Sequence, residues 1–215
     1  MPIEDFIITV FCLIDDACKK IGGGHRLRTR GFEPKLSDSE VITMDVVGEF
    51  LGRDTDTGIW RYVKEHWFSL FPELGSRGNY AKQSANLWII KQRIQASFAA
   101  QSGALSDTLH MADGLPMPIC HFKRAGFSSI FKGIASYGYC ASKSETYYGF
   151  KGNLTIGSDV IGQLSQQFHI EKVRARDLWH LTNRIGRKVL AHTVGMMVNK
   201  ILGNPPLQFE CLEIV

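Results

Sequence analysis

The sequence predicts an α+β fold, with an all-helical N-terminal region followed by a mixed region. Apolar residues recur at helical spacing through residues 1–100. From residue 108 to residue 156 the pattern changes to short runs rich in aromatic and β-branched residues, which are typical of strands. Helical spacing returns from residue 160. These changes divide the chain into residues 1–100, 101–156 and 157–215.

Four helices are expected in the first region. The first covers residues 4–20, with acidic residues at its start and Lys19 and Lys20 at its end, as the helix dipole favours. The second begins after Ser37, which forms a capping-box sequence with Glu40. The last two are expected over residues 56–71, ended by Pro72, and over residues 80–100.

Three strands and two further helices are expected after the helical region. The strands cover residues 108–120, 136–141 and 145–156. Because Gly114, Pro116 and Pro118 interrupt the first of them, we expect that strand to run into a rigid loop. The helices cover residues 160–168 and 178–202, and the tail from residue 204 is expected to be irregular.

Composition excludes several classes of protein. The chain of 215 residues is 44% hydrophobic and 21% charged, so a disordered chain is excluded. It has no apolar run of roughly 18 residues, so no membrane-spanning helix is expected. Its five cysteines include no CxxC pair, which favours free thiols in a reducing cytosol over a disulfide framework. We therefore expect a cytoplasmic globular protein.

The positive charge is concentrated in the second half of the chain. Residues 1–120 hold 13 Lys and Arg against 15 Asp and Glu, whereas residues 121–215 hold 12 against 6. The two parts therefore carry −2 and +6 of the formal net charge of +4. A basic C-terminal part favours a polyanionic partner.

One acidic residue and one His/Cys group are candidates for metal chemistry. Asp113 lies near the end of an apolar run, where a carboxylate either bonds the following turn or binds a metal, and spacing alone favours the turn. A single carboxylate is a weak Mg²⁺ site. His110, Cys120 and His121 match no standard zinc spacing, so zinc is not expected.

Three groups of cationic residues are candidates for DNA contacts. Their alternative interpretation is an ordinary solvated surface. The linker group is Arg26, Arg28 and Arg30. The second group, interleaved with aromatic residues that could stack on bases, is Lys123, Arg124, Lys132 and Lys151. The third group, in the C-terminal helices, is Arg174, Arg176, Arg184, Arg187 and Lys188.

Several long strings of the sequence, taken in order, resemble one family. They include LSDSEVITMDVVGEFLG (36–52), DTDTGIWRYVKEHWFSLFPELGSR (54–77), MADGLPMPIC (111–120), ASYGYCASKSETYYGFKG (135–152) and IGQLSQQFHIEKVRARDLWHLTNRIGRKVLAH (161–192). The chain resembles bacterial insertion-sequence transposases of the DDE type, in the insertion-sequence nine-eight-two group.

The resemblance implies a fold, a reaction and partners. It implies a ribonuclease-H-like catalytic domain in which two Asp and one Glu bind two Mg²⁺. Such enzymes cut and join DNA at insertion-sequence ends by Mg-dependent phosphodiester hydrolysis and strand transfer. Asp113 stands at the position of the first acidic residue, which makes it the candidate catalytic residue and metal ligand. The implied partners are DNA carrying terminal inverted repeats and further copies of a transposase, in the nucleoid of a bacterial cytoplasm.

The chain departs from the family pattern after residue 156. GNLTIGSD runs directly into VIGQLSQQF, so the string bearing the second Asp is missing, and no Glu stands just before Ile161, where the family has its Glu. Asn153 also stands where the family usually has His. The resemblance therefore implies an internal deletion and an incomplete catalytic domain. We expect a truncated, catalytically inactive transposase; the alternative is a DNA-binding or dimerising regulator that inhibits an intact transposase.

Overall fold

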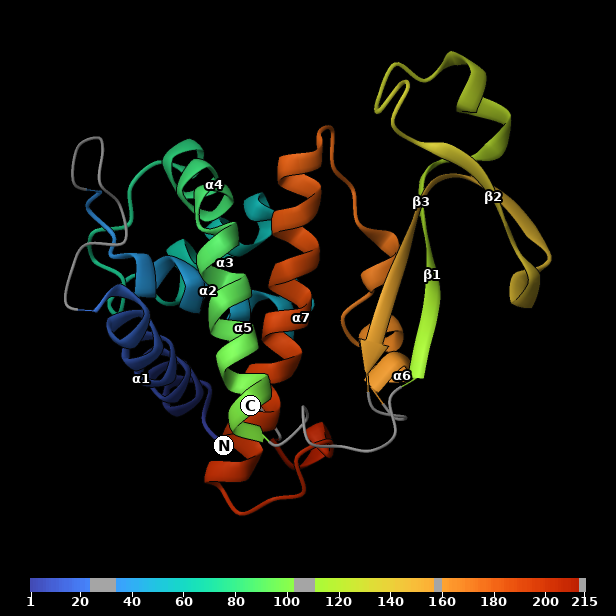
Figure 1. The fold of residues 1–215 in the computed structure, drawn as a ribbon. Helices are drawn as coiled ribbons and strands as arrows, with labels where there is room; N and C mark the ends of the chain where they lie inside the picture. Colours follow the sequence, from blue (N-terminus) through green and yellow to red (C-terminus); the bar gives the residue numbers. More distant parts are fainter. Residues whose placement is uncertain (24–33, 103–110, 157–159, 213–215) are drawn as a thin grey trace.

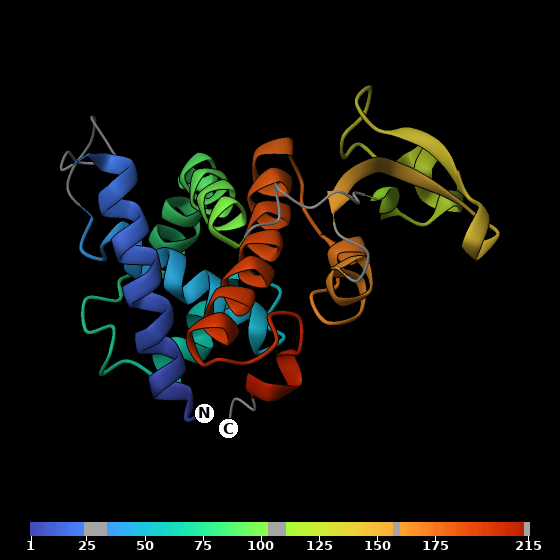
Figure 2. The same cartoon turned by 60° about the horizontal axis from the view of Figure 1, so that its bottom comes forward.

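The computed structural model describes residues 1–23, 34–102, 111–156 and 160–212. Its helices form a bundle, and its strands form a smaller lobe beside that bundle (Figures 1 and 2). The three strands make one antiparallel sheet. The predicted α+β class is therefore confirmed at this level. The structure does not extend that class to a ribonuclease-H-like domain, which stays a prediction.

Six helices build the bundle. They are α1 (Ile3–Gly22), α2 (Asp38–Phe50), α3 (Asp56–His66), α4 (Arg77–Asn86), α5 (Trp88–Ser102) and α7 (Leu178–Ile201). Helix α7 packs against α5 and α2 and lies between α5 and the strands in both views (Figures 1 and 2). Leu190, Val194 and Val198 of α7 are fully buried in the core shared with the N-terminal helices. The last long helix thus completes the core of the N-terminal helices.

The predicted starts of the first helices are confirmed. Helix α1 begins with Glu4 and Asp5 in its first turn. At α2, the Ser37 hydroxyl accepts a hydrogen bond from the Glu40 amide at 3.1 Å, and the Glu40 carboxylate accepts one from the Ser37 amide at 2.6 Å. These reciprocal bonds satisfy two amides that the helix leaves unpaired, so the sequence signal acts locally.

Two helix predictions were wrong at their ends. Helix α3 ends at His66, because the chain from Trp67 folds into turns that bury Phe71. The helix expected over residues 80–100 is two helices, divided at Leu87. In a continuous helix the Ser84 carbonyl would accept from the amide of residue 88; here it accepts from the Leu87 amide and from the Lys91 ammonium at 3.0 Å. A buried side chain therefore takes the place of a helical hydrogen bond.

The sheet has the order β1-β3-β2, with β1 (Met111–Cys120), β2 (Ser136–Cys140) and β3 (Glu145–Ile156). The rigid loop expected within residues 114–120 was wrong, because β1 continues through both prolines to Cys120. An edge strand tolerates proline, since its outward amide positions need no partner. Close strand packing also depends on Gly149, where a Cβ would lie 2.1 Å from the Met117 carbonyl oxygen.

Short segments join the strands within the lobe, connect the lobe to the bundle and close the core. They are η2 (Phe122–Phe127), η3 (Ala141–Lys143), α6 (Val160–Gln166), η4 (Ile170–Lys172) and η5 (Phe209–Leu212). The tail expected to be irregular instead places Phe209 and Leu212 in the core. Phe209 packs edge-on against Phe50 and Phe168, and Gly195 of α7 leaves room for these rings.

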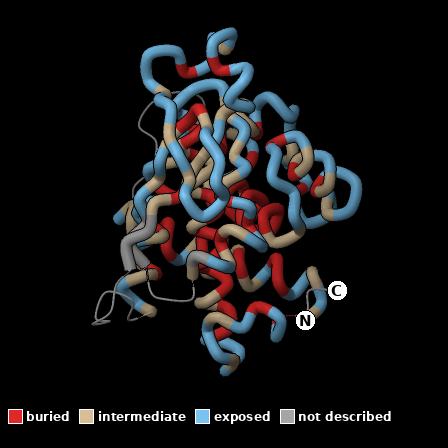
Figure 3. The backbone as a smooth tube through the Cα atoms, turned by 90° about the vertical axis from the view of Figure 1, so that its right-hand side faces the viewer, coloured by how far each residue is buried: buried red, intermediate tan, exposed pale blue. Residues whose placement is uncertain are grey.

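Burial differs between the two parts of the molecule. Buried backbone gathers in the helices, whereas the lobe in front of them is mainly exposed or intermediate (Figure 3). Among the described residues, no helix is both long and apolar enough to cross a membrane.

Candidate nucleic-acid interface

Asp113 lies on the edge strand β1, in register with Leu154 of β3. The β3 residues on either side of that pairing are Asn153 and Thr155, so the neighbouring strand offers no carboxylate there. Strand β3 is the only strand paired with β1 in the described sheet. Strand β3 therefore provides no second acidic residue next to Asp113, the predicted catalytic residue.

The described residues do not fit a two-magnesium centre. Such a centre needs several carboxylates that converge on the ions. The described part of the chain contains no group of three or more His, Cys, Asp or Glu side chains that could hold a metal ion. The donor set around β1 thus does not match the magnesium site that the family resemblance implies.

Four arginines from three segments of the chain line a single cleft between the bundle and the sheet. Arg77 is the first residue of α4, Arg174 and Arg176 precede α7, and Arg184 belongs to α7. We call this cavity of about 600 Å³ the arginine cleft. Met117 and Phe150 form its apolar wall on the sheet side. The fold thus brings three predicted DNA-binding residues together with Arg77.

Two of the cleft arginines make no ion pair or hydrogen bond among the described residues. Arg174 and Arg176 are exposed, and neither makes an ion pair within the described ranges. Arg184 donates to the Asp56 carboxylate at 2.9 Å, while its buried Nε–H has no hydrogen-bond partner among the described residues. A buried donor without an acceptor costs about 1–3 kcal/mol.

The acidic residues of the cleft are already engaged. Asp177 caps α7 by accepting from the His180 amide at 2.9 Å, and these bonds outweigh its desolvation, so its pKa is lowered. Burial raises the pKa of Asp56, but the Arg187 and Arg184 guanidinium groups outweigh burial and hold that pKa below its ordinary value. Both carboxylates therefore stay ionised and fix the ends of α3 and α7 that border the cleft.

The structure contradicts the DNA-contact prediction for Arg187 and Lys188. Arg187 is 0% exposed and donates to Glu49 at 2.5 Å, to Asp56 at 2.9 Å and to the Asp54 carbonyl at 2.9 Å. Lys188 is also buried and donates to Glu49 at 2.7 Å. These cations neutralise carboxylates inside the bundle and do not reach a phosphate, because α7 turns this face toward α2 and α3.

The same network continues through Asp45 at the centre of the bundle. Its carboxylate accepts hydrogen bonds from Tyr80, Ser84 and Lys91, all of them buried. Burial lowers the pKa of Lys91, with Asp45 opposing that effect, and burial together with Asp45 raises the pKa of Tyr80. Asn183 of α7 accepts from Lys91 at 2.7 Å. Every polar group in this cluster has a partner, which is the pattern of a structural network.

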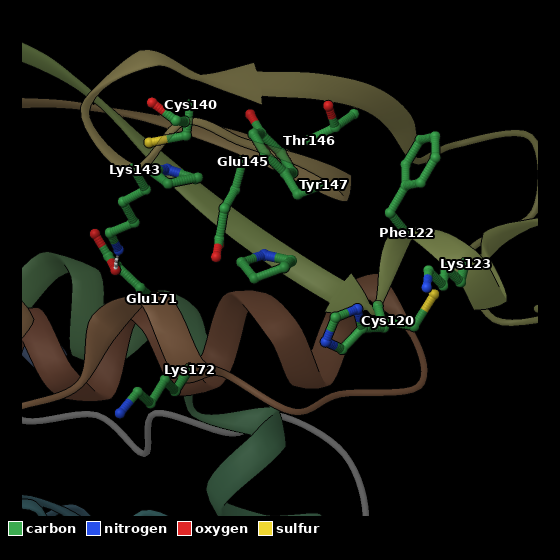
Figure 4. Close-up of a pocket in the computed structure, with 14 residues that line it drawn as sticks. Cys120, Phe122, Lys123, Cys140, Lys143, Glu145, Thr146, Tyr147, Glu171 and Lys172 are labelled. Carbon is green, nitrogen blue, oxygen red and sulfur yellow. Dashed lines mark hydrogen bonds and ion pairs between the residues drawn. The ribbon is translucent and has the colours of Figure 1, made fainter.

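A second cavity, the hairpin pocket, lies between the tip of the lobe and η4 (Figure 4). Lys143 forms an ion pair with Glu171, which ties the hairpin turn to η4. Cys140 accepts or donates a hydrogen bond with Ser142, which lowers its pKa. No hydrogen bond in the described part of the chain links the pocket residue His121 to a cysteine or a carboxylate. The pocket therefore offers no assembled nucleophile and base.

The structure describes one of the two other predicted cationic groups. Lys123, Arg124, Lys132 and Lys151 are all exposed, as a DNA-contact role requires. The linker residues Arg26, Arg28 and Arg30 lie outside the described residues, and so does His110 of the rejected zinc set.

Sequence reasoning missed Arg77. One signal could have found it: a cation at the first residue of a helix is disfavoured by the helix dipole, so its presence there points to another role.

Comparisons with known proteins give no independent identification. No protein-family model matches the chain, and no curated protein or solved structure matches it.

Proposed function

We propose that this chain is a shortened, catalytically inactive relative of DDE transposases that has kept the ability to bind DNA. The relationship to transposases is supported by the matched strings, which occur in the family's order along the sequence. The observation that carries DNA binding is the arginine cleft, where Arg77, Arg174 and Arg176 converge from two sides of one cavity. Arginines bind phosphate oxygens with paired donors, and such contacts supply most of the affinity for DNA.

The proposed inactivity is supported by the lack of acidic residues beside Asp113. Two-metal phosphoryl chemistry needs converging carboxylates, and the β3 residues in register around Asp113 are neutral. We therefore assign no cleavage step to this chain. A protein that occupies insertion-sequence ends without cutting them would compete with an intact transposase, and this is the regulatory role that the proposal favours.

The test measures binding and cleavage on the same DNA. Duplexes of the inverted repeats flanking the gene and a shuffled duplex are titrated by fluorescence anisotropy across a salt series. We expect salt-sensitive binding that prefers the repeats, with no nicking or strand transfer in Mg²⁺ or Mn²⁺. Metal-dependent nicking that is lost in Asp113→Ala would overturn the proposed inactivity.

A charge-removing variant locates the binding site. Arg174→Gln with Arg176→Gln should weaken duplex binding about tenfold and reduce the log–log salt slope by about 2. The matched control removes two exposed cations that do not line the cleft, Lys20→Gln with Arg93→Gln. Equal losses in both double variants would contradict a role for the cleft.

A further inference from the structure

The lobe presents aromatic rings to solvent, which a folded protein usually buries. The exposed fractions are 93% for Phe127, 65% for Tyr139, 58% for Tyr137 and 48% for Phe122. A cluster of exposed rings on one small lobe is typical of a binding surface.

Two of these rings, Phe122 and Tyr137, pack against other rings. Tyr137 lies opposite Tyr148 in the sheet register, and their ring centroids are 5.1 Å apart. Phe122 packs edge-on against Tyr137 at 5.5 Å. Tyr139 is two residues beyond Tyr137 in β2, so it lies on the same face of the sheet. We call Phe122, Tyr137 and Tyr139 the aromatic platform; the buried Tyr148 ring supports it from within.

The charge around the platform is mainly positive. Residues 114–152 contain five Lys and Arg and one acidic residue, Glu145, which lines the same pocket as Phe122 together with Glu171. Lys143 is paired with Glu171, whereas Lys123, Arg124 and Lys132 are exposed and make no ion pair within the described residues. Rings beside unpaired cations fit a ligand with flat bases and a negative backbone better than an apolar protein surface.

The platform is continuous with the arginine cleft. Phe150 lines that cleft and lies two residues from Tyr148 on β3, so both rings lie on one face of the sheet. A row of rings therefore runs from the cleft through Tyr148 to the platform. DNA held in the cleft would meet the platform along this face.

We propose that the aromatic platform binds single-stranded DNA, with its rings stacked on bases and Lys123, Arg124 and Lys132 near phosphates. Bases in a duplex are already stacked on each other, so the platform selects unpaired strands. The inference rests on the proposed function, because it extends DNA binding from the cleft to the lobe.

The test compares a single strand with a duplex on the full chain. Labelled oligothymidine of 20 nucleotides and a 20-base-pair duplex are titrated by anisotropy. Phe122→Leu with Tyr139→Leu should weaken oligothymidine binding at least about tenfold and leave duplex binding unchanged. Tyr139→Phe should keep the binding, because it keeps the ring. The control is Phe68→Leu, which alters an exposed ring outside the lobe.

The outcomes separate the two proposals. Duplex binding without binding of oligothymidine overturns the platform alone, whereas no binding of either DNA overturns the proposed function as well. Circular dichroism first establishes that the double variant is folded, and if it is not, Tyr139→Leu alone takes its place. If the folded variant binds oligothymidine as tightly as the unmodified chain, the platform is overturned. Tighter binding of oligouridine RNA than of oligothymidine overturns the assignment to DNA.

Discussion

Glu49→Gln tests whether the buried network between α2 and α7 holds the bundle together. The Glu49 carboxylate is 3% exposed and accepts from Arg187 at 2.5 Å and from Lys188 at 2.7 Å. Glutamine keeps the shape of the side chain and removes its charge. Arg187 retains Asp56 and the Asp54 carbonyl, so the main loss falls on Lys188, whose ammonium has no other hydrogen bond among the described residues.

The expected loss of stability is large. Removing one partner of a buried ion pair costs about 3–5 kcal/mol, and we expect about 4 kcal/mol for Glu49→Gln. A domain is stable by only about 5–15 kcal/mol, so the variant should be folded but marginal. The measurement is urea unfolding followed by circular dichroism, with the dependence on urea concentration unchanged.

A double variant and a surface control sharpen this test. Adding Lys188→Met to Glu49→Gln removes the unpaired ammonium, so the double variant should be more stable than Glu49→Gln alone. Glu65→Gln, at an exposed carboxylate on α3, should change stability by less than about 0.5 kcal/mol. A loss below about 1 kcal/mol in Glu49→Gln, or a double variant less stable than the single one, would refute the reasoning.

Three further predictions concern pH, capping and strand packing. Burial lowers the pKa of His192 from 6.5 to about 4, so between these pH values the unfolded chain binds a proton that the folded chain does not. Stability should therefore fall by about 3 kcal/mol as pH drops through this window, and His192→Gln should flatten the fall in urea midpoints. Ser37→Ala should cost about 1 kcal/mol in thermal unfolding, and a larger Tm loss in an exposed Ser→Ala control such as Ser129 would contradict the cap. Gly149→Ala should separate β1 from β3 and speed amide exchange in β3, whereas Gly126→Ala, with no atom within 4 Å of the new Cβ, should not.

The elements that the sequence predicted well are those fixed by local interactions. The capping box at Ser37 and Glu40 spans three residues, and β3 occupies the predicted residues 145–156. The divided helix at Leu87 was not predictable in this way, because its cause is a bond from Lys91 to Ser84 within a buried network. The position of α7 beside α2 likewise depends on packing partners far away in the chain.

The candidate site also has a part that the sequence predicts and a part that depends on tertiary packing. The sequence by itself determined where cations and aromatic residues are concentrated, and two of the predicted cations, Arg174 and Arg176, are exposed. Only the tertiary structure decided that Arg187 and Lys188 belong to the core while Arg77 joins the cleft. The physical reason is that a pattern of charges shows which side chains are cationic, but not which face of a helix other helices will bury. The partner that covers Arg187 is Glu49, 138 positions earlier in the chain, and such a pairing exists only once the helices have packed.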